Sequence, residues 1–299
     1  MDSSDLRGVF PPIPTPFDAE GDIDRDALKR NLTWWNDQAF SGYVVLGSNG
    51  EAAHLVESEK LALIAAVRAA ASEDRIVIAG TGLLFTAATI WLTQQAAAAG
   101  ADVALVLPPF FYRGLMTSAV LTEHFERVAD ASPIPILLYN MPANTGIDLP
   151  ASIIIDLSRH ENVAGVKDSS GNVAKLSEIR HAVDPGFAIL AGSAGFLLPA
   201  LSVGADGGVL ALANIAPAAC LEIFDLATAG EWEKARAIQN RLVRANATIT
   251  RRWGVPALKA AMDELGLYGG PPRRPLLPLA DELRAELREI LREACILEL

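Results

Sequence analysis

The stretch Ala164-Gly165-Val166-Lys167-Asp168-Ser169-Ser170-Gly171-Asn172 passes from a short apolar run, through a lysine, into a polar turn that contains glycine. The apolar run, from Val163 to Lys167, predicts a buried strand. The segment after the turn, Val173 to Ala182, has the periodicity of a helix. The quoted stretch is therefore the turn of a strand-then-helix unit.

The same unit occurs eight times between residues 9 and 229, at intervals of roughly 20 to 35 residues. Its strands are apolar throughout, which is typical of parallel strands covered by helices. We therefore predict an α/β fold, a (β/α)8 TIM barrel. A doubly wound open sheet is the alternative, but no G-x-G-x-x-G follows the first strand. The predicted strands are Val9–Phe17, Gly42–Leu46, Arg75–Gly82, Asp102–Leu107, Ile134–Tyr139, Val163–Lys167, Phe187–Ala191 and Gly207–Leu210.

The alternation of strands and helices stops beyond Gly230. Three helices are predicted there, at Glu231–Ala247, Val255–Leu265 and Leu279–Ala294. We therefore expect residues 1–229 to form the barrel that carries the functional site. Residues 230–299 are expected to form a C-terminal helical region packed on it.

Composition narrows the class of protein. The formal net charge of −11 argues against nucleic acid and anionic membranes as partners, because both need a basic surface. The two cysteines, Cys220 and Cys295, are far apart in sequence, which is typical of a reducing compartment. The first seven residues are acidic and lack the apolar core of a secretory signal. A cytoplasmic protein is expected.

Lys167 is the candidate for chemistry. The other five lysines lie in segments with helical periodicity, where we expect them to be solvated. A lysine at the end of a buried strand needs a carboxylate partner, for which Asp168 is one candidate, or it must give up its proton. A neutral lysine amine is a nucleophile toward carbonyl groups. From sequence context the ion pair is the commoner case, so both interpretations stay open.

In TIM barrels the site lies at the carboxyl ends of the strands. A lysine, a tyrosine and several hydroxyls at those ends suit a carbonyl substrate that bears a carboxylate, because the amine can form an imine and the hydroxyls can bind the acid. Purely structural roles, as core tyrosine, tight turn or helix cap, are alternatives for individual members. The four histidines lack metal-ligand spacing, so no metal is expected. The candidates are Lys167, Tyr139, Tyr112, Ser48, Asn49, Ser169, Gly192, Ser193 and Asn214.

Four motifs stand in order at predicted strand ends: Gly47-Ser48-Asn49-Gly50-Glu51, Tyr139-Asn140-x-Pro142, Gly165-Val166-Lys167-Asp168-Ser169 and Leu190-Ala191-Gly192-Ser193. With them the chain resembles the dihydrodipicolinate synthase / N-acetylneuraminate lyase superfamily of class I, pyruvate-imine aldolases over essentially its whole length. The resemblance implies that Lys167 forms a Schiff base with a 2-oxo acid and that Tyr139 is the general acid and base. The residues implied to line the substrate pocket are Ser48, Asn49, Ser169 and Ser193.

Within the superfamily, the stretches 142–150, 250–256 and 268–271 most resemble 4-hydroxy-2-oxoglutarate aldolases. Dihydrodipicolinate synthases carry an arginine shortly after the tyrosine, which holds the second carboxylate of their aldehyde substrate. Here Ala143-Asn144-Thr145 occupies that place, so the synthase activity is not expected.

The superfamily also often lends a tyrosine across a subunit interface, from the loop after the fourth strand. Phe111 occupies that position here, with Tyr112 beside it. Either Tyr112 substitutes or the proton relay is shorter. By the same analogy we expect a homotetramer.

The resulting hypothesis is reversible aldol cleavage of a 4-hydroxy-2-oxo acid to pyruvate and an aldehyde such as glyoxylate, without a cofactor. An aldolase for 2-keto-3-deoxy sugar acids would share every catalytic residue. A 2-oxo-acid sensor without turnover is the alternative from another class, but a sensor needs neither Lys167 nor Tyr139.

Overall fold

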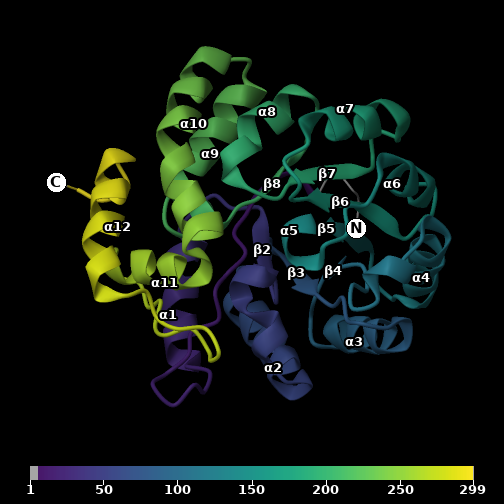
Figure 1. Ribbon diagram of the computed structural model, residues 1–299, viewed down its shortest axis with the longest axis horizontal. Coiled ribbons are helices and arrows are strands. Elements are labelled where there is room, and N and C mark those ends of the chain that lie inside the picture. The colour runs from purple at the N-terminus through teal and green to yellow at the C-terminus, as the bar shows by residue number, and fades with distance from the viewer. Residues whose placement is uncertain (1–5, 299) are drawn as a thin grey trace.

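The computed structural model describes residues 6–298, and within them eight parallel strands form one curved sheet in the order β1-β8-β7-β6-β5-β4-β3-β2 (Figure 1). Single hydrogen bonds close the remaining gap between β1 and β2. The N–H of Ile13 donates to the carbonyl of Val44, and the N–H of Val44 donates to the carbonyl of Pro11, each at 3.0 Å. The predicted (β/α)8 barrel is confirmed. The strands are β1 (Gly8–Phe10), β2 (Gly42–Val45), β3 (Ile76–Gly80), β4 (Val103–Val106), β5 (Ile136–Asn140), β6 (Val163–Asp168), β7 (Ala188–Ala191) and β8 (Gly207–Val209).

Helices follow each strand and cover the outside of the barrel. Polar caps start several of them: the side chain of Asp24 accepts from the Ala27 N–H at 2.8 Å, and that of Asn172 accepts from the Lys175 N–H at 3.1 Å. The main helices are α1 (Arg25–Asn36), α2 (Glu57–Ala70), α3 (Thr86–Ala98), α4 (Ser118–Ala131), α6 (Ala151–Leu157), α7 (Val173–Ala182), α8 (Leu197–Ser202) and α9 (Pro217–Thr228). Shorter turns are η2 (Ser48–Gly50), η3 (Ala52–His54), η4 (Arg113–Leu115), α5 (Pro142–Thr145), η5 (Ala194–Phe196) and η6 (Ala211–Asn214).

The first strand is shorter than its apolar sequence predicts. β1 ends at Phe10, whereas the prediction extended it to Phe17. The prolines at positions 11, 12, 14 and 16 have no N–H to give to a sheet ladder, so the chain leaves the sheet there.

Alternation along the strands decides which side chains enter the barrel. In β5, Ile136 and Leu138 belong to the core between strands and helices, whereas Leu137 and Tyr139 belong to the core inside the barrel. Tyr139 is therefore an interior residue near the carboxyl end of β5, where TIM-barrel sites lie.

A register shift between β5 and β6 aligns the site. Ile136 pairs with Val163, but the next residue, Leu137, pairs with Gly165, so β6 has one extra residue at this point. Beyond the shift Tyr139 pairs with Lys167. If the register of Ile136 with Val163 continued without the shift, Lys167 would lie opposite Asn140 and point to the other face. Bulges of this kind commonly re-aim side chains beside active sites.

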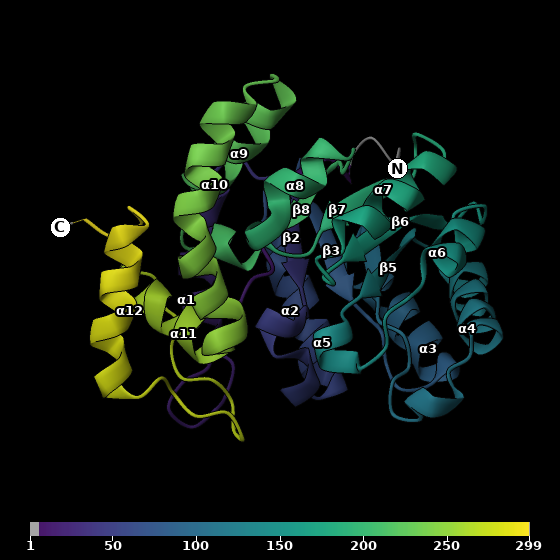
Figure 2. The ribbon, with the colours of Figure 1, turned by 45° about the horizontal axis from the view of Figure 1, so that its top comes forward.

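The C-terminal helices gather on one side of the barrel (Figure 2). α10 (Trp232–Ala247) packs against α8 and α9, and a π-helical turn (Thr248–Arg252) leads directly into α11 (Gly254–Glu264), which contacts α12 (Asp281–Glu293). The sequence predicted two separate helices here, ending at Ala247 and beginning at Val255. In the structure a π-helical turn joins them. Among the described residues, no helix has both the length and the apolar composition needed to cross a bilayer.

Candidate active site

Lys167 and Tyr139 lie together inside the mouth of the barrel. The Lys167 side chain is buried, and its Nζ lies 3.9 Å from the centre of the Tyr139 ring. No carboxylate of residues 6–298 lies within 4.0 Å of this Nζ. The amine is thus placed beside a phenol and is not engaged by a carboxylate among the described residues.

Asp168, the suggested carboxylate partner, is engaged on the other face of the sheet. One of its oxygens, Oδ2, lies 2.7 Å from Lys175 Nζ and accepts from Asn140 Nδ2 at 2.8 Å. The other accepts from the backbone N–H of Ser170 at 2.8 Å. Strand alternation explains this separation, because consecutive residues of β6 point to opposite faces. The interpretation of Lys167 as an ion-pair partner of Asp168 is therefore wrong.

The expectation that the other five lysines are solvated is also wrong for three of them. Lys60, Lys175 and Lys259 are buried, with 9%, 7% and 1% of their surface exposed. Lys175 lies between Asp168 and Asp148, and Lys259 is bonded to a carboxylate and two carbonyls. Helical periodicity places these lysines on helices, but it does not show which other segments of the chain cover them. Lys167 differs from Lys175 and Lys259 in having no such acceptors.

Because Asp168 is buried, Lys175 has a structural role as its ion-pair partner. Replacing Lys175 tests this ion pair. We expect Lys175→Met to lower the free energy of unfolding by about 3–5 kcal/mol, because it leaves a buried carboxylate uncompensated. The matched variant Asp148→Asn removes the exposed partner of the same lysine and is expected to cost about 1 kcal/mol or less. Urea denaturation measures both. Equal losses would show that Asp168 does not depend on Lys175.

Ser48 meets Tyr139 from the turn after β2. Its Oγ lies 3.3 Å from the Tyr139 hydroxyl. Burial raises the pKa of Tyr139, but the positive charge of Lys167, the hydrogen bond from Ser48 and the nearby polar groups of Lys167 and Ser169 outweigh it, so that the pKa lies below its ordinary value of 10.0. A phenol adjusted in this way is suited to exchanging protons near the amine.

Ser169 and Gly192 form the next part of the wall. The Oγ of Ser169 is buried without a well-formed hydrogen bond to another group. A Cβ at position 192 would lie 1.9 Å from this oxygen and 2.8 Å from the carbonyl oxygen of Asp168. Glycine is therefore required there for Ser169 to keep its place. The free hydroxyl is available to a ligand.

The remaining predicted binding residues are less directly connected to the amine. Asn49 is half-buried in η2, beside Ser48. Ser193 caps η5 and accepts from Asn246 Nδ2 at 3.0 Å. Asn214 is fully buried, and its amide nitrogen donates to the carbonyls of Pro12 and Ala211. The hydrogen bonds of Ser193 and Asn214 therefore join segments of the protein to one another and have a structural role.

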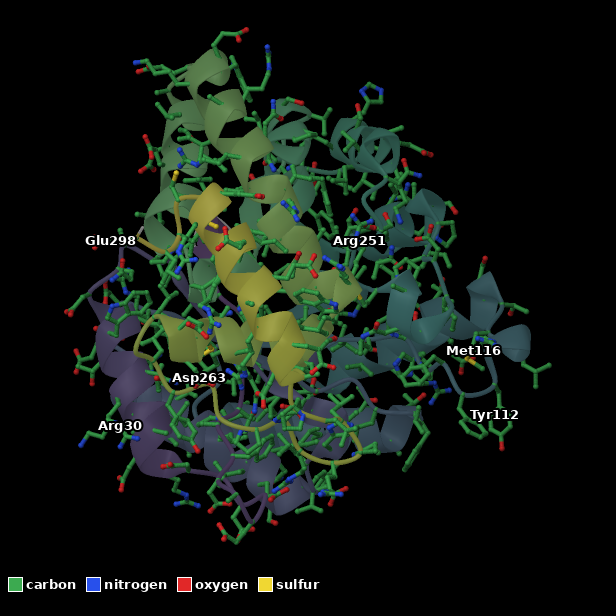
Figure 3. All side chains as sticks on the ribbon, turned by 60° about the vertical axis from the view of Figure 1, so that its left-hand side comes forward. Arg30, Tyr112, Met116, Arg251, Asp263 and Glu298 are labelled. Carbon is green, nitrogen blue, oxygen red and sulfur yellow. The ribbon has the colours of Figure 1, made fainter. Side chains whose placement is uncertain are left out.

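Tyr112 lies away from the amine within its own chain. It is 68% exposed and its ring packs edge-on against Phe111, with centroids 5.0 Å apart. Figure 3 shows Tyr112 at the edge of the molecule. Any part in the reaction would have to be played in a neighbouring subunit.

A cavity of about 540 Å³ opens beside this cluster, a size suited to a small metabolite. Ser48 and Tyr139 line it, and seven of its twenty lining residues are leucines. Asn144 and Thr145, from the segment that lacks the arginine of the synthases, also line it. Neither residue is among the nine candidates predicted from the sequence.

A lysine with no carboxylate partner, next to a phenol at the mouth of a (β/α)8 barrel, is an arrangement suited to lyases that activate a carbonyl as an imine. The model of the dihydrodipicolinate synthetase family matches residues 5–294. The chain belongs to this family and is a pyruvate-dependent lyase.

Known relatives match along the whole chain. A probable mitochondrial 4-hydroxy-2-oxoglutarate aldolase of Emericella nidulans is 40% identical over 298 residues, covering 98% of this chain and 96% of the relative. A 4-hydroxy-tetrahydrodipicolinate synthase of Methanothrix thermoacetophila is 38% identical, covering 96% of each. The crystal structure of a dihydrodipicolinate synthase from Bacillus anthracis superposes with a TM-score of 0.92 at 31% identity, covering 96% of this chain and 98% of that one.

Proposed function

We propose that this chain is a class I aldolase that cleaves a 4-hydroxy-2-oxo acid, in the first place 4-hydroxy-2-oxoglutarate, to pyruvate and glyoxylate. The observation that carries the proposal is the placement of the buried Lys167 amine beside Tyr139, with no carboxylate of the described residues paired to it. The relative from Emericella nidulans, named for this activity, supports the choice of substrate.

In this scheme the Lys167 amine adds to the C2 carbonyl and water leaves, which gives a protonated imine. Tyr139 gives a proton to the departing oxygen and later takes the proton of the C4 hydroxyl. The C3–C4 bond then breaks, and its electron pair moves into the imine while the aldehyde leaves. Protonation at C3 and hydrolysis release pyruvate and restore the amine. Ser48 and Asn49 bind the C1 carboxylate.

The amino acids after Tyr139 favour an aldolase over a synthase. Asn144 and Thr145 line the cavity as neutral groups where the synthases have an arginine. A site without that arginine offers less to the long, carboxylate-bearing aldehyde of the synthases. It also offers no cation at this place to the C5 carboxylate of 4-hydroxy-2-oxoglutarate, so the choice of that substrate rests on the relative from Emericella nidulans.

A substrate panel tests the proposal. Pyruvate and aldehyde release are measured with 4-hydroxy-2-oxoglutarate and with 2-keto-3-deoxy sugar acids. We expect kcat/KM for 4-hydroxy-2-oxoglutarate to exceed the others by about ten-fold or more. A preference for the sugar acids would assign the chain to that class, and pyruvate binding without turnover on any substrate would make it a sensor.

We also propose that the chain works as a homo-oligomer, a homotetramer by family analogy, in the cytoplasm. Phe111, Tyr112 and Leu115 expose about 70% of their surface on one loop, which is unusual for aromatic and leucine side chains that stay in water. A second copy that covers this loop would bring Tyr112 to the neighbouring site. Cys220 and Cys295 are both free thiols, as in a reducing compartment.

Tyr112→Phe tests the part of the proposal that concerns the neighbouring site. If the hydroxyl relays protons there, kcat falls by about 10²-fold while the oligomeric state, measured by sedimentation, stays the same. Phe111→Leu serves as the control, because it alters the same exposed pair without removing a hydroxyl. An unchanged kcat in Tyr112→Phe would mean that the relay ends within one chain.

A further inference from the structure

The turn that carries Ser48 and Asn49 is held in an unfavourable conformation. Leu46 and Glu51, on its two sides, both have left-handed backbones, with φ of 60° and 54°. Side chains larger than glycine rarely adopt this conformation unless the surroundings enforce it. Gly80 packs against Leu46, since a Cβ there would lie 2.1 Å from its carbonyl oxygen. The support for Glu51 comes from a different part of the chain.

The Glu51 carboxylate is buried, with 1% of its side chain exposed. Its Oε1 lies 3.1 Å from Nζ of Lys259, a residue of α11, and its Oε2 accepts from the backbone N–H of Arg273 at 2.9 Å. Lys259 Nζ also donates to the carbonyls of Thr15 and Pro271, each at 2.8 Å. The ammonium group is therefore held by one ion pair and two hydrogen bonds.

The same lysine supports the turn from a second side. Thr15, whose carbonyl accepts from Lys259, donates its own hydroxyl to the carbonyl of Gly50 at 2.6 Å. Lys259 thus fixes Glu51 through its carboxylate and Gly50 through Thr15. Arg273 extends this contact: its guanidinium donates to the carbonyl of His54 at 2.9 Å, just after the turn.

We propose that Glu51 and Lys259 are positioning residues for the active site, which hold the Gly47–Glu51 turn so that Ser48 stays within reach of Tyr139. The C-terminal helical region is then a working part of the site, because it supplies the lysine. Replacing a buried ion pair by apolar groups often leaves stability unchanged, so stability alone gives no reason for this pair. The inference rests on the proposed imine mechanism, in which Ser48 binds substrate and adjoins Tyr139.

The test compares Glu51→Gln, the double variant Glu51→Gln/Lys259→Met and the control Asp102→Asn. The control makes the same carboxylate-to-amide change in a partly buried ion pair with Arg68, 3.2 Å away, beside the amino ends of β3 and β4. We expect kcat/KM to fall by about 10²-fold in the first two variants and to stay within a few-fold of wild type in the control.

Two further readouts separate positioning from a loss of folding. Trapping of pyruvate by borohydride should still label Lys167 in every variant, since the amine is untouched. The basic limb of the pH profile should move to higher pH in the two Glu51 variants, because the Ser48 hydrogen bond that lowers the pKa of Tyr139 is weakened. The double variant leaves no unpaired buried charge, so it keeps the test valid if the single variant is unstable.

Wild-type kcat/KM and an unmoved basic limb in the folded double variant would overturn the inference. Failure to trap pyruvate on wild-type Lys167 would instead overturn the proposed imine mechanism. The two failures are thus distinguishable in one set of measurements.

Discussion

Replacing Lys167 by alanine is expected to abolish turnover, with kcat/KM at least about 10⁴-fold lower, because the amine that lies beside Tyr139 and forms the imine is lost. Wild-type protein reduced with borohydride in the presence of pyruvate should gain the mass of one pyruvate, less water, plus two hydrogens. Peptide mass spectrometry should place this mass on Lys167. The variant should gain nothing.

Lys259 provides an internal control for this experiment. It is as deeply buried as Lys167, but its Nζ is bonded to Glu51 and to two backbone carbonyls. Burial lowers the pKa of Lys259, more than the negative charge of Glu51 raises it. If burial alone made a lysine reactive, Lys259 would be labelled as well. A label on Lys259, or no label on the wild type, would contradict the assignment.

The barrel itself could be predicted because each strand is a separate apolar run between polar turns. Eight such runs can be recognised from local sequence alone, without knowing which residues meet in the fold. The order of the strands around a barrel then follows their order in the sequence. The limits of β1 were wrong because the apolar run continues through prolines that cannot join a ladder.

The candidate pair of Lys167 and Tyr139 could be found because both residues end apolar strands that are neighbours in the barrel. Their alignment depends on the register shift in β6, for which Gly165 is the one signal in the sequence, since a glycine inside a strand often marks a bulge. The apolar runs thus predict the two strands but not the register that sets the amine beside the phenol.

Burial of the helical lysines could not be predicted, since it depends on partners far along the chain. Lys259 is bonded to Thr15, 244 positions away, and to Glu51. Periodicity identifies the polar side of a helix but not whether another segment covers it. The same limit explains why residues 230–299 looked like an addition to the barrel although they contact the active-site turn.

Tyr139→Phe is expected to lower kcat by about 10²–10⁴-fold and to slow imine formation without preventing it, because the proton-transferring hydroxyl is lost while the amine remains. Borohydride trapping with pyruvate should therefore still label Lys167, more slowly than in wild type, whereas Lys167→Ala gives no label at all. A kcat within a few-fold of wild type would show that another group moves the protons.

The pH dependence of kcat/KM is a second test of the role of Tyr139 in proton transfer. The pH dependence of kcat/KM reports the ionisation of groups in the free enzyme. There the Tyr139 phenol must be protonated, because it gives its proton to the oxygen that departs as water. Since the charge of Lys167 and the Ser48 hydrogen bond help to hold the Tyr139 pKa below 10.0, activity should begin to fall below that pH. Ser48→Ala should move this basic limb to higher pH, toward the ordinary value. Tyr139→Phe should remove it, and a limb that persists in Tyr139→Phe would belong to a different group.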